Sequence, residues 1–197
     1  MKEADFDWEN TYFADEKWWA LDGPANREGL WVGKHEPRPI LSRMGRHQAF
    51  LRVWGCFSAN GALDLVRVDE PWCAKTYCSV LEKSGLPRGS VLLHDRDTSH
   101  QAYAVKAFFK RRSVKIDAHL FPPCAADINP IENLWGIVTN RIFTGVCVFS
   151  CKEKLWEAVK EAWAGVQADN ALLRRMAQSV PTRLALVQKA KGGLVMY

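Results

Sequence analysis

The chain has 197 residues, of which 48% are apolar and 25% are charged, and its formal net charge is +5. This composition is too apolar for an intrinsically disordered chain, and the length suits one domain with a sizeable core. No apolar run approaches the ~20 residues that a membrane span needs, and the acidic start of the chain lacks the apolar core of a secretory signal.

The first half of the chain is predicted to form an antiparallel meander of strands. An aromatic-rich run predicts a strand over 12–21, which ends at the turn residues Asp22-Gly23-Pro24. Further strands are predicted at Trp31-Val32 and over 49–58. The dipeptide Asn60-Gly61 favours a two-residue hairpin turn, followed by a returning strand over 62–68.

The second half of the chain alternates strands with helices and then becomes helical. The apolar run over 90–95 predicts a strand buried on both faces, and a second strand is predicted over 114–120. Helices are predicted over 71–83, 101–111, 130–141, 152–166, 171–179 and 182–191, with Pro71 and Pro130 near the first turns of two of them. The inner faces of two helices are expected to consist of Ala104, Val105, Phe108 and Phe109, and of Leu155, Val159, Trp163 and Val166. Together these elements indicate an α/β fold, a mixed sheet with flanking helices.

Cysteines and tryptophans give weaker indications. Six cysteines without a C-x-x-C pair favour reduced, mostly buried thiols in an intracellular protein, and the spacing of Cys147 and Cys151 is poor for zinc. Nine tryptophans are many for this length, and some of them are expected in the core. Trp18 and Trp19 are neighbours in a predicted strand, so one should face the core and the other the opposite side.

Three carboxylates occupy positions where an uncompensated charge is costly. Asp15 lies inside the first strand, Asp95 ends the buried strand, and Glu132 lies in the first turn of a helix. Ends of strands and starts of helices are where open α/β sheets bind ligands. Three converging carboxylates suit a hard cation such as magnesium or manganese, although an Asp at a strand end is most often a turn or helix cap.

Four motifs, in order along nearly the whole chain, carry a family resemblance. The chain reads F-A-D-E-K…L-D-G-P over 13–24, V-W-G-C-F-S over 53–58, F-P-P-C-A-A-D-I-N-P-I-E-N-L-W over 121–135 and S-V-P-T-R…K-A-K-G-G over 179–193. These segments resemble the catalytic domain of mariner-type DDE transposases, the Tc/mariner superfamily. The resemblance implies a ribonuclease-H-like fold, with one catalytic domain over 1–197 whose helical C-terminal part is 151–197. The family's N-terminal helix-turn-helix domains are expected to be absent.

The resemblance also assigns roles to individual residues. It makes Asp15, Asp95 and Glu132 the catalytic and metal-binding triad for two Mg²⁺ or Mn²⁺ ions, which activate the attacking water and stabilise the leaving 3′-oxygen. His100 is expected to orient a carboxylate or contact a phosphate, or else to be satisfied by local hydrogen bonds. Asn129 is expected to cap the helix that carries Glu132.

The second aspartate has a rival. The family motif Q-D-N-A-P-x-H corresponds here to His94-Asp95-Arg96-Asp97-Thr98-Ser99-His100, so Asn-Ala-Pro is replaced. Between Asp95 and Glu132 lie 36 residues, whereas the family commonly has 34, and counting from Asp97 gives 34. Asp95 is preferred because it directly follows the apolar strand and lies five residues before His100, as in the family motif.

The function implied by the resemblance is metal-dependent cleavage and strand transfer on double-stranded DNA, in the nucleus, with a second copy or another protein as a further partner. A domesticated module that binds nucleic acid or protein without cleavage is the alternative. A ribonuclease H acting on RNA–DNA hybrids is a third reading, against which the N-P-I-E-N-L-W segment argues.

Basic residues along the chain offer a track for DNA phosphates. The candidates are Arg38, Arg43, Arg46 and His47 in a loop, Lys110, Arg111 and Arg112 at a helix end where they equally suit the helix dipole, and the C-terminal Arg174, Arg175, Arg183, Lys189 and Lys191.

Overall fold

The computed structural model describes residues 7–23, 49–116, 128–144 and 148–190. Its strands are β1 (Thr11–Ala20), β2 (Phe50–Ser58), β3 (Gly61–Ala62), β4 (Val66–Val68), β5 (Val91–Leu93) and β6 (Lys115–Ile116). Its helices are α1 (Ala74–Lys83), α2 (Tyr103–Arg112), α3 (Ile131–Ile142), α4 (Lys152–Gln167), α5 (Asn170–Gln178) and α6 (Val180–Lys189). The predicted strand at 31–32 lies outside the described residues, as does the part of the predicted strand 114–120 beyond Ile116.

The described strands form one mixed sheet in the order β3-β2-β1-β5-β6, with β4 also paired to β2. β1 runs antiparallel to β2 and parallel to β5, and β5 runs parallel to β6. The predicted combination of a meander with parallel strands is therefore confirmed. β1 is central, so side chains at alternate positions along it point to the two opposite faces of the sheet.

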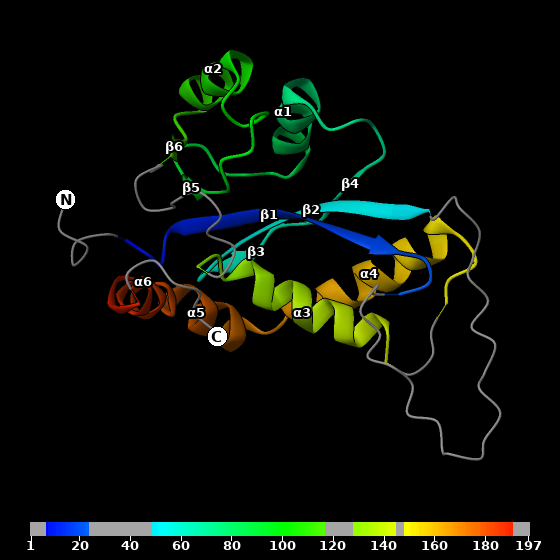
Figure 1. Cartoon of the computed structure of the whole chain (residues 1–197). Coiled ribbons are helices and arrows are strands. Elements are labelled where there is room, and N and C mark those ends of the chain that lie inside the picture. The colour runs from blue at the N-terminus through cyan, green and yellow to red at the C-terminus, as the bar shows by residue number, and fades with distance from the viewer. Residues whose placement is uncertain (1–6, 24–48, 117–127, 145–147, 191–197) are drawn as a thin grey trace.

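Helices cover both faces of this sheet, as Figure 1 shows: α1 and α2 lie on one side and α3 to α6 on the other. Each side has its own hydrophobic core. Phe13 and Trp19 of β1 belong to the core under α3 and α4, whereas Ala14 belongs to the core under α1 and α2. The stripe predicted on α4 is buried at all four of its positions.

The predicted boundaries differ from the structure where a side chain competes with the expected backbone pattern. The hairpin turn comprises Ala59 and Asn60, one residue earlier than predicted, because the Ser58 hydroxyl accepts the Asn60 N–H at 3.2 Å and Gly61 already pairs with Ser58. Helix α1 begins three residues after Pro71 because Thr76 binds the Pro71 carbonyl at 2.8 Å and the residue before the helix is extended.

Three other predictions of pairing and burial are wrong. The strand over 62–68 is broken into β3 and β4, and Trp163 donates its indole N–H to the Leu63 carbonyl between them at 2.9 Å. Ala104 is exposed because the buried face of α2 is formed by Val105, Phe108 and Phe109. Of the four cysteines in the described part of the chain, all are free but only Cys56 is buried.

The abundance of tryptophan is explained largely by the core below the sheet. Trp135 of α3 packs edge-on against Trp19 with ring centroids 5.6 Å apart and lies 5.3 Å from Trp163 of α4. Trp19 also donates its indole N–H to the Thr139 hydroxyl at 2.9 Å. Its neighbour Trp18 is 50% exposed, so the prediction that these two side chains point to opposite faces is confirmed.

Candidate active site

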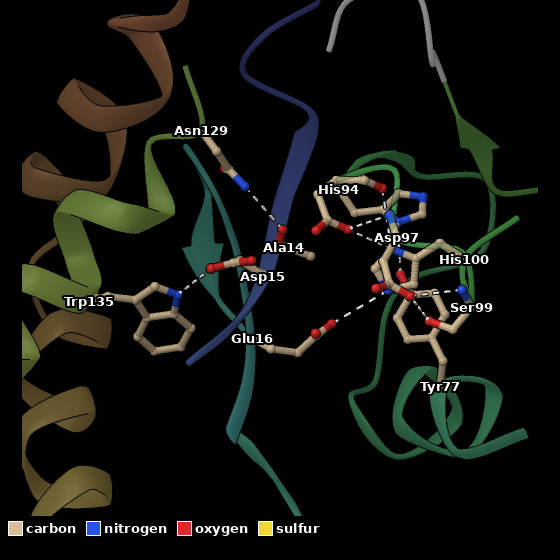
Figure 2. A network of polar contacts seen from close by, with 11 residues as sticks. Ala14, Asp15, Glu16, Tyr77, His94, Asp97, Ser99, His100, Asn129 and Trp135 are labelled. Carbon is tan, nitrogen blue, oxygen red and sulfur yellow. Dashed lines mark hydrogen bonds and ion pairs between the residues drawn. The ribbon is translucent and has the colours of Figure 1, made fainter. Parts of the chain in front are cut away.

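Asp15 lies in the middle of β1, on the face of the sheet that α3 covers. Trp135 of α3 donates its indole N–H to Asp15 Oδ2 at 3.1 Å, as Figure 2 shows. The residue paired with Asp15 on β2 is Gly55, and a Cβ at this position would lie 2.9 Å from Trp135 Cζ2 and 3.0 Å from Leu65 Cδ2. The missing side chain at Gly55 therefore leaves the space that the Trp135 ring needs to reach the carboxylate.

Glu132 lies in the first turn of α3, close to the same part of β1. Burial, together with the negative charges of Glu132 and Glu16, raises the pKa of Asp15 to about 7. Lys17 Nζ lies 3.7 Å from Glu132 Oε2 and offers one positive charge to this group. Asp15 and Glu132 thus form a pair of acids that one lysine compensates only in part.

Asn129 has a different role from the predicted helix cap. Pro130 is the residue that precedes α3, and no side chain caps the start of this helix. The Asn129 amide instead donates to the Ala14 carbonyl at 3.2 Å and so ties the start of α3 to β1 beside Asp15 (Figure 2). Its Oδ1 is buried and has no hydrogen-bond partner in the described part of the chain. The reason for the difference is that strand β1 offers a buried carbonyl which needs a donor.

Asp95 follows β5 by two residues, on the strand next to β1. The last parallel pair between these strands joins Phe13 to Leu93, and two further residues along each strand lead to Asp15 and Asp95. His100 binds the Asp95 carboxylate, with Nδ1 and Oδ1 2.8 Å apart. This hydrogen bond lowers the pKa of Asp95. His100 thus orients a carboxylate, which is one of the roles predicted for it.

Glu16 is a member of this site that the sequence analysis did not single out. It points to the opposite face from Asp15, where its Oε1 lies 3.5 Å from His100 Nε2 (Figure 2). Burial alone would lower the pKa of His100, but its hydrogen bonds to Asp95 and Glu16 raise the pKa to about 9. A protonated imidazole therefore lies between two carboxylates. Three consecutive charged residues in a central strand, Asp15-Glu16-Lys17, could have revealed Glu16, since alternation forces buried charge onto both faces.

Asp97 makes local contacts of a different kind. Its Oδ1 accepts hydrogen bonds from both the backbone N–H and the hydroxyl of Ser99, with the N–H at 2.7 Å. These contacts close the turn that precedes α2, which is the structural role expected of an aspartate in a loop. Asp95 also accepts a local hydrogen bond, from the Asp97 N–H at 3.1 Å, but its carboxylate binds the buried His100 as well.

The three acids predicted to be catalytic fall into two groups of contacts. Asp15 and Glu132 influence each other directly, on the face covered by α3. The contacts of Asp95 lead to His100 and through it to Glu16, the residue next to Asp15 in β1. Strand β1 therefore lies between the two groups and contributes one carboxylate to each.

Among the basic residues predicted to contact DNA, several have partners within the chain. Arg111 pairs with Glu82 at 3.0 Å, and Arg112 donates to the Leu86 carbonyl at 2.8 Å, whereas Lys110 is exposed. Arg183 is 2% exposed, so its place in a surface track for DNA is wrong. Arg174, Arg175 and Lys189 are exposed. The candidates Arg38, Arg43, Arg46, His47 and Lys191 lie outside the described residues.

A mixed sheet with helices on both faces and carboxylates around its central strand is consistent with the ribonuclease-H-like fold that the motifs imply. Residues 10–156 match the family model described as DDE superfamily endonuclease, and the chain belongs to this family.

Curated relatives include two nematode transposases. The chain is 27% identical over 200 residues to the transposable element Tc3 transposase of Caenorhabditis elegans, an alignment that covers 96% of this chain and 59% of the relative. It is 28% identical over 204 residues to the Tcb2 transposase of Caenorhabditis briggsae, with 97% of this chain and 71% of the relative covered. The chain therefore spans about three fifths of the length of the Tc3 transposase.

Solved structures with the same fold include a Mos1 mariner paired end complex with Mn, with a TM-score of 0.79 at 18% identity over 98% of this chain and 59% of the other. The Mos1 transposase catalytic domain with Raltegravir and Mg has a TM-score of 0.73 at 14% identity, over 98% of this chain and 89% of the other. These similarities confirm the ribonuclease-H-like fold implied by the motifs.

Proposed function

We propose that this chain is the catalytic part of a DNA transposase, which cleaves phosphodiester bonds and transfers the freed strand to a target. The observation that carries this proposal is the Asp15 carboxylate in the central strand β1, which the Trp135 indole of α3 holds beside Glu132 in the first turn of the same helix. Such a pair of acids, with Lys17 as its one ion-pair partner in the described part of the chain, is costly to keep in a folded chain unless a cation binds there. Membership of the DDE endonuclease family and the transposase relatives support the same chemistry.

The residues at the site fit a hard divalent cation. Asp15 and Glu132 offer carboxylate oxygens. Asn129, whose side-chain amide donates to the Ala14 carbonyl next to Asp15, adds a buried Oδ1 that has no hydrogen-bond partner in the described part of the chain. We infer that two Mg²⁺ or Mn²⁺ ions are held by Asp15, Asp95 and Glu132, and structures of the Mos1 transposase have been solved with the same two metals. When bound, these ions supply an activated water and stabilise the leaving 3′-oxygen.

The remaining residues of the site hold these acids in place. The Trp135 indole fixes the direction of the Asp15 carboxylate, and the Asn129 amide fixes the backbone of β1 beside it. His100 holds Asp95 in its ionised form, which is the form that binds a cation. Lys17 neutralises part of the charge of Glu132 and keeps it near β1.

The partner in this proposal is double-stranded DNA, reached through exposed basic residues such as Lys110, and the place of action is the nucleus. A second copy of the chain is a further proposed partner, since one of the similar Mos1 structures is a paired-end complex. The described part of the chain contains no helix that is long and apolar enough to cross a membrane.

A nicking assay tests the proposal. The full chain is incubated with supercoiled duplex DNA and Mg²⁺ or Mn²⁺, and compared with the variants Asp95→Ala and Asp97→Ala. We expect nicking that depends on the metal, is lost in Asp95→Ala and is kept in Asp97→Ala. Loss in Asp97→Ala alone would move the second catalytic aspartate to position 97.

The alternative, a module that binds DNA without cleavage, makes a different prediction in the same experiment. Unaltered DNA with every metal, together with a salt-dependent mobility shift, would support binding alone. Nicking that is equal in the wild type and in both variants would refute the catalytic assignment, since the activity would then come from a contaminant or another site.

A further inference from the structure

Two imidazoles and a carboxylate meet at the end of β5. The Nδ1 atoms of His94 and His100 are 2.9 Å apart, and His100 Nδ1 lies 2.8 Å from Asp95 Oδ1. One ligand atom from each of these residues lies within 4.8 Å of the others. His94 stands where the transposase motif quoted above has Gln.

The centre of this group is rich in lone pairs and poor in protons. His100 Nδ1 carries at most one proton and lies 2.8 Å from Asp95 Oδ1, 3.2 Å from the Asp95 carbonyl and 2.9 Å from His94 Nδ1. One N–H cannot align with all three of these atoms, and the Tyr77 hydroxyl, 3.4 Å from His94 Nδ1, is a further polar group beside them. A divalent cation in its place could accept several of these lone pairs together.

The donor set favours a late transition metal over magnesium. Two imidazole nitrogens with one carboxylate are characteristic ligands of Zn²⁺ and related ions. Ligands at about 2.0–2.1 Å around a tetrahedral ion lie about 3.4 Å from one another. The two short separations here would widen by roughly half an ångström, a shift that small side-chain rotations can supply.

The surroundings of His100 match those of a metal-bound histidine. Such a histidine commonly donates its second ring N–H to a carboxylate, which fixes the direction of the ring. His100 Nε2 lies 3.5 Å from Glu16 Oε1 and has no shorter hydrogen-bond partner in the described part of the chain. The Tyr77 ring packs against the other side of His100 with centroids 4.1 Å apart. The Asp95 side chain is 62% exposed and leaves a route from solvent.

From these contacts we propose that His94, Asp95 and His100 bind Zn²⁺ or another late first-row divalent cation, in a site that shares Asp95 with the carboxylate site. An Asp95 carboxylate directed at this ion is withdrawn from Asp15 and Glu132. Zinc therefore inhibits cleavage that depends on magnesium. This consequence for catalysis rests on the proposed function, whereas the binding of the ion does not.

Cobalt(II) gives the binding site a direct readout without DNA. The full chain is titrated with Co²⁺ and followed by its visible absorption, and Zn²⁺ is then added to displace it. We expect a saturable band of histidine-bound Co²⁺, at least tenfold weaker binding in His94→Gln, and wild-type binding in Glu132→Gln. No band in the wild type, or equal binding in His94→Gln, overturns the proposal and leaves these residues as a hydrogen-bonded network only.

A second variant keeps the test decisive if His94→Gln does not fold. Glu16→Gln removes the carboxylate behind His100 without touching a ligand, and loss of such a partner weakens metal binding by about 10- to 100-fold. Unchanged Co²⁺ affinity in Glu16→Gln then counts against the site. In the nicking assay, Zn²⁺ is expected to inhibit at the concentrations that displace Co²⁺. Nicking that zinc does not inhibit refutes the sharing of Asp95, and a complete absence of nicking refutes the proposed function while leaving the absorption result intact.

Discussion

The substitution Gly55→Ala tests whether the missing side chain at position 55 of β2 gives Trp135 the space to reach Asp15. A Cβ at position 55 overlaps the Trp135 ring and lies 3.0 Å from Leu65 Cδ2. Trp135 cannot move away easily, because Trp19 and Trp163 pack against it at 5.6 and 5.3 Å between ring centroids. Forcing a methyl group into such a core costs about 1–3 kcal/mol.

Part of this cost is offset in the unfolded chain. Replacing glycine by alanine removes conformational freedom from the unfolded state and stabilises the folded state by about 0.4–1 kcal/mol where the backbone permits it. We therefore expect Gly55→Ala to lower the free energy of unfolding by about 1–2 kcal/mol. For a domain of this size, that corresponds to a decrease in Tm of roughly 2–8 °C.

The matched control is Gly136→Ala, on the same helix as Trp135. A Cβ there meets no atom within 4 Å, and the position is exposed, so the substitution is expected to stabilise helix α3 by up to about 1 kcal/mol. Urea unfolding followed by tryptophan fluorescence measures both variants. If Gly55→Ala is as stable as Gly136→Ala, the close approach of Trp135 to β2 is not the constraint inferred here.

Three further predictions concern the same region. The pKa of Asp15 is raised from 3.8 to about 7 on folding, so between these pH values only the folded chain holds this proton. The free energy of unfolding of the metal-free wild type should therefore fall from pH 4 to 7 relative to that of Asp15→Asn. Urea unfolding in the presence of a chelator measures both proteins. Parallel pH profiles of the two proteins would contradict the raised pKa of Asp15. Trp135→Phe removes the donor to Asp15, and since a hydrogen bond to a charged group contributes about 1.5–3 kcal/mol, the Mn²⁺ concentration for half-maximal nicking should rise at least tenfold. An unchanged requirement for Mn²⁺ would show that this indole does not position the carboxylate. Arg183 donates to Asn133 Oδ1 at 2.7 Å and to the Ser179 hydroxyl at 2.8 Å, so Arg183→Lys should destabilise the chain by about 1–3 kcal/mol in urea, unlike the exposed control Arg174→Lys.

The elements that the sequence predicted well are those whose pattern is set by their own residues. The aromatic strand β1, the strand β2 and the amphipathic helix α4 follow from alternation and from the spacing of Leu155, Val159 and Trp163. Boundaries were predicted less well, because they depend on single contacts such as that of Thr76 with Pro71. Local patterns do not specify such contacts, which form only when the chain has folded.

The candidate site also combines features that local sequence predicts with features that depend on contacts in the folded chain. Asp15, Asp95 and Glu132 could be selected from the sequence because they lie inside a strand, at a strand end and in the first turn of a helix, and because the family motifs mark the same three positions. The partner of Glu16 and the role of Asn129 could not be assigned in this way, since both depend on contacts with residues far along the chain. His100 lies 84 positions from Glu16, and Ala14 lies 115 positions from Asn129. Only the packing of β5 and α3 against β1 brings these groups into contact.

The alternation of β1 explains why this site can hold so many acids without unfolding. Asp15 and Lys17 point toward α3, and Glu16 points toward His100 on the other face. On the His100 side, the positive imidazole compensates two carboxylates within the folded chain. On the α3 side, the charge is relieved by protonation of Asp15, whose pKa is about 7. A cation that binds on the α3 side must therefore displace this proton, so its affinity should increase as the pH rises toward and above 7.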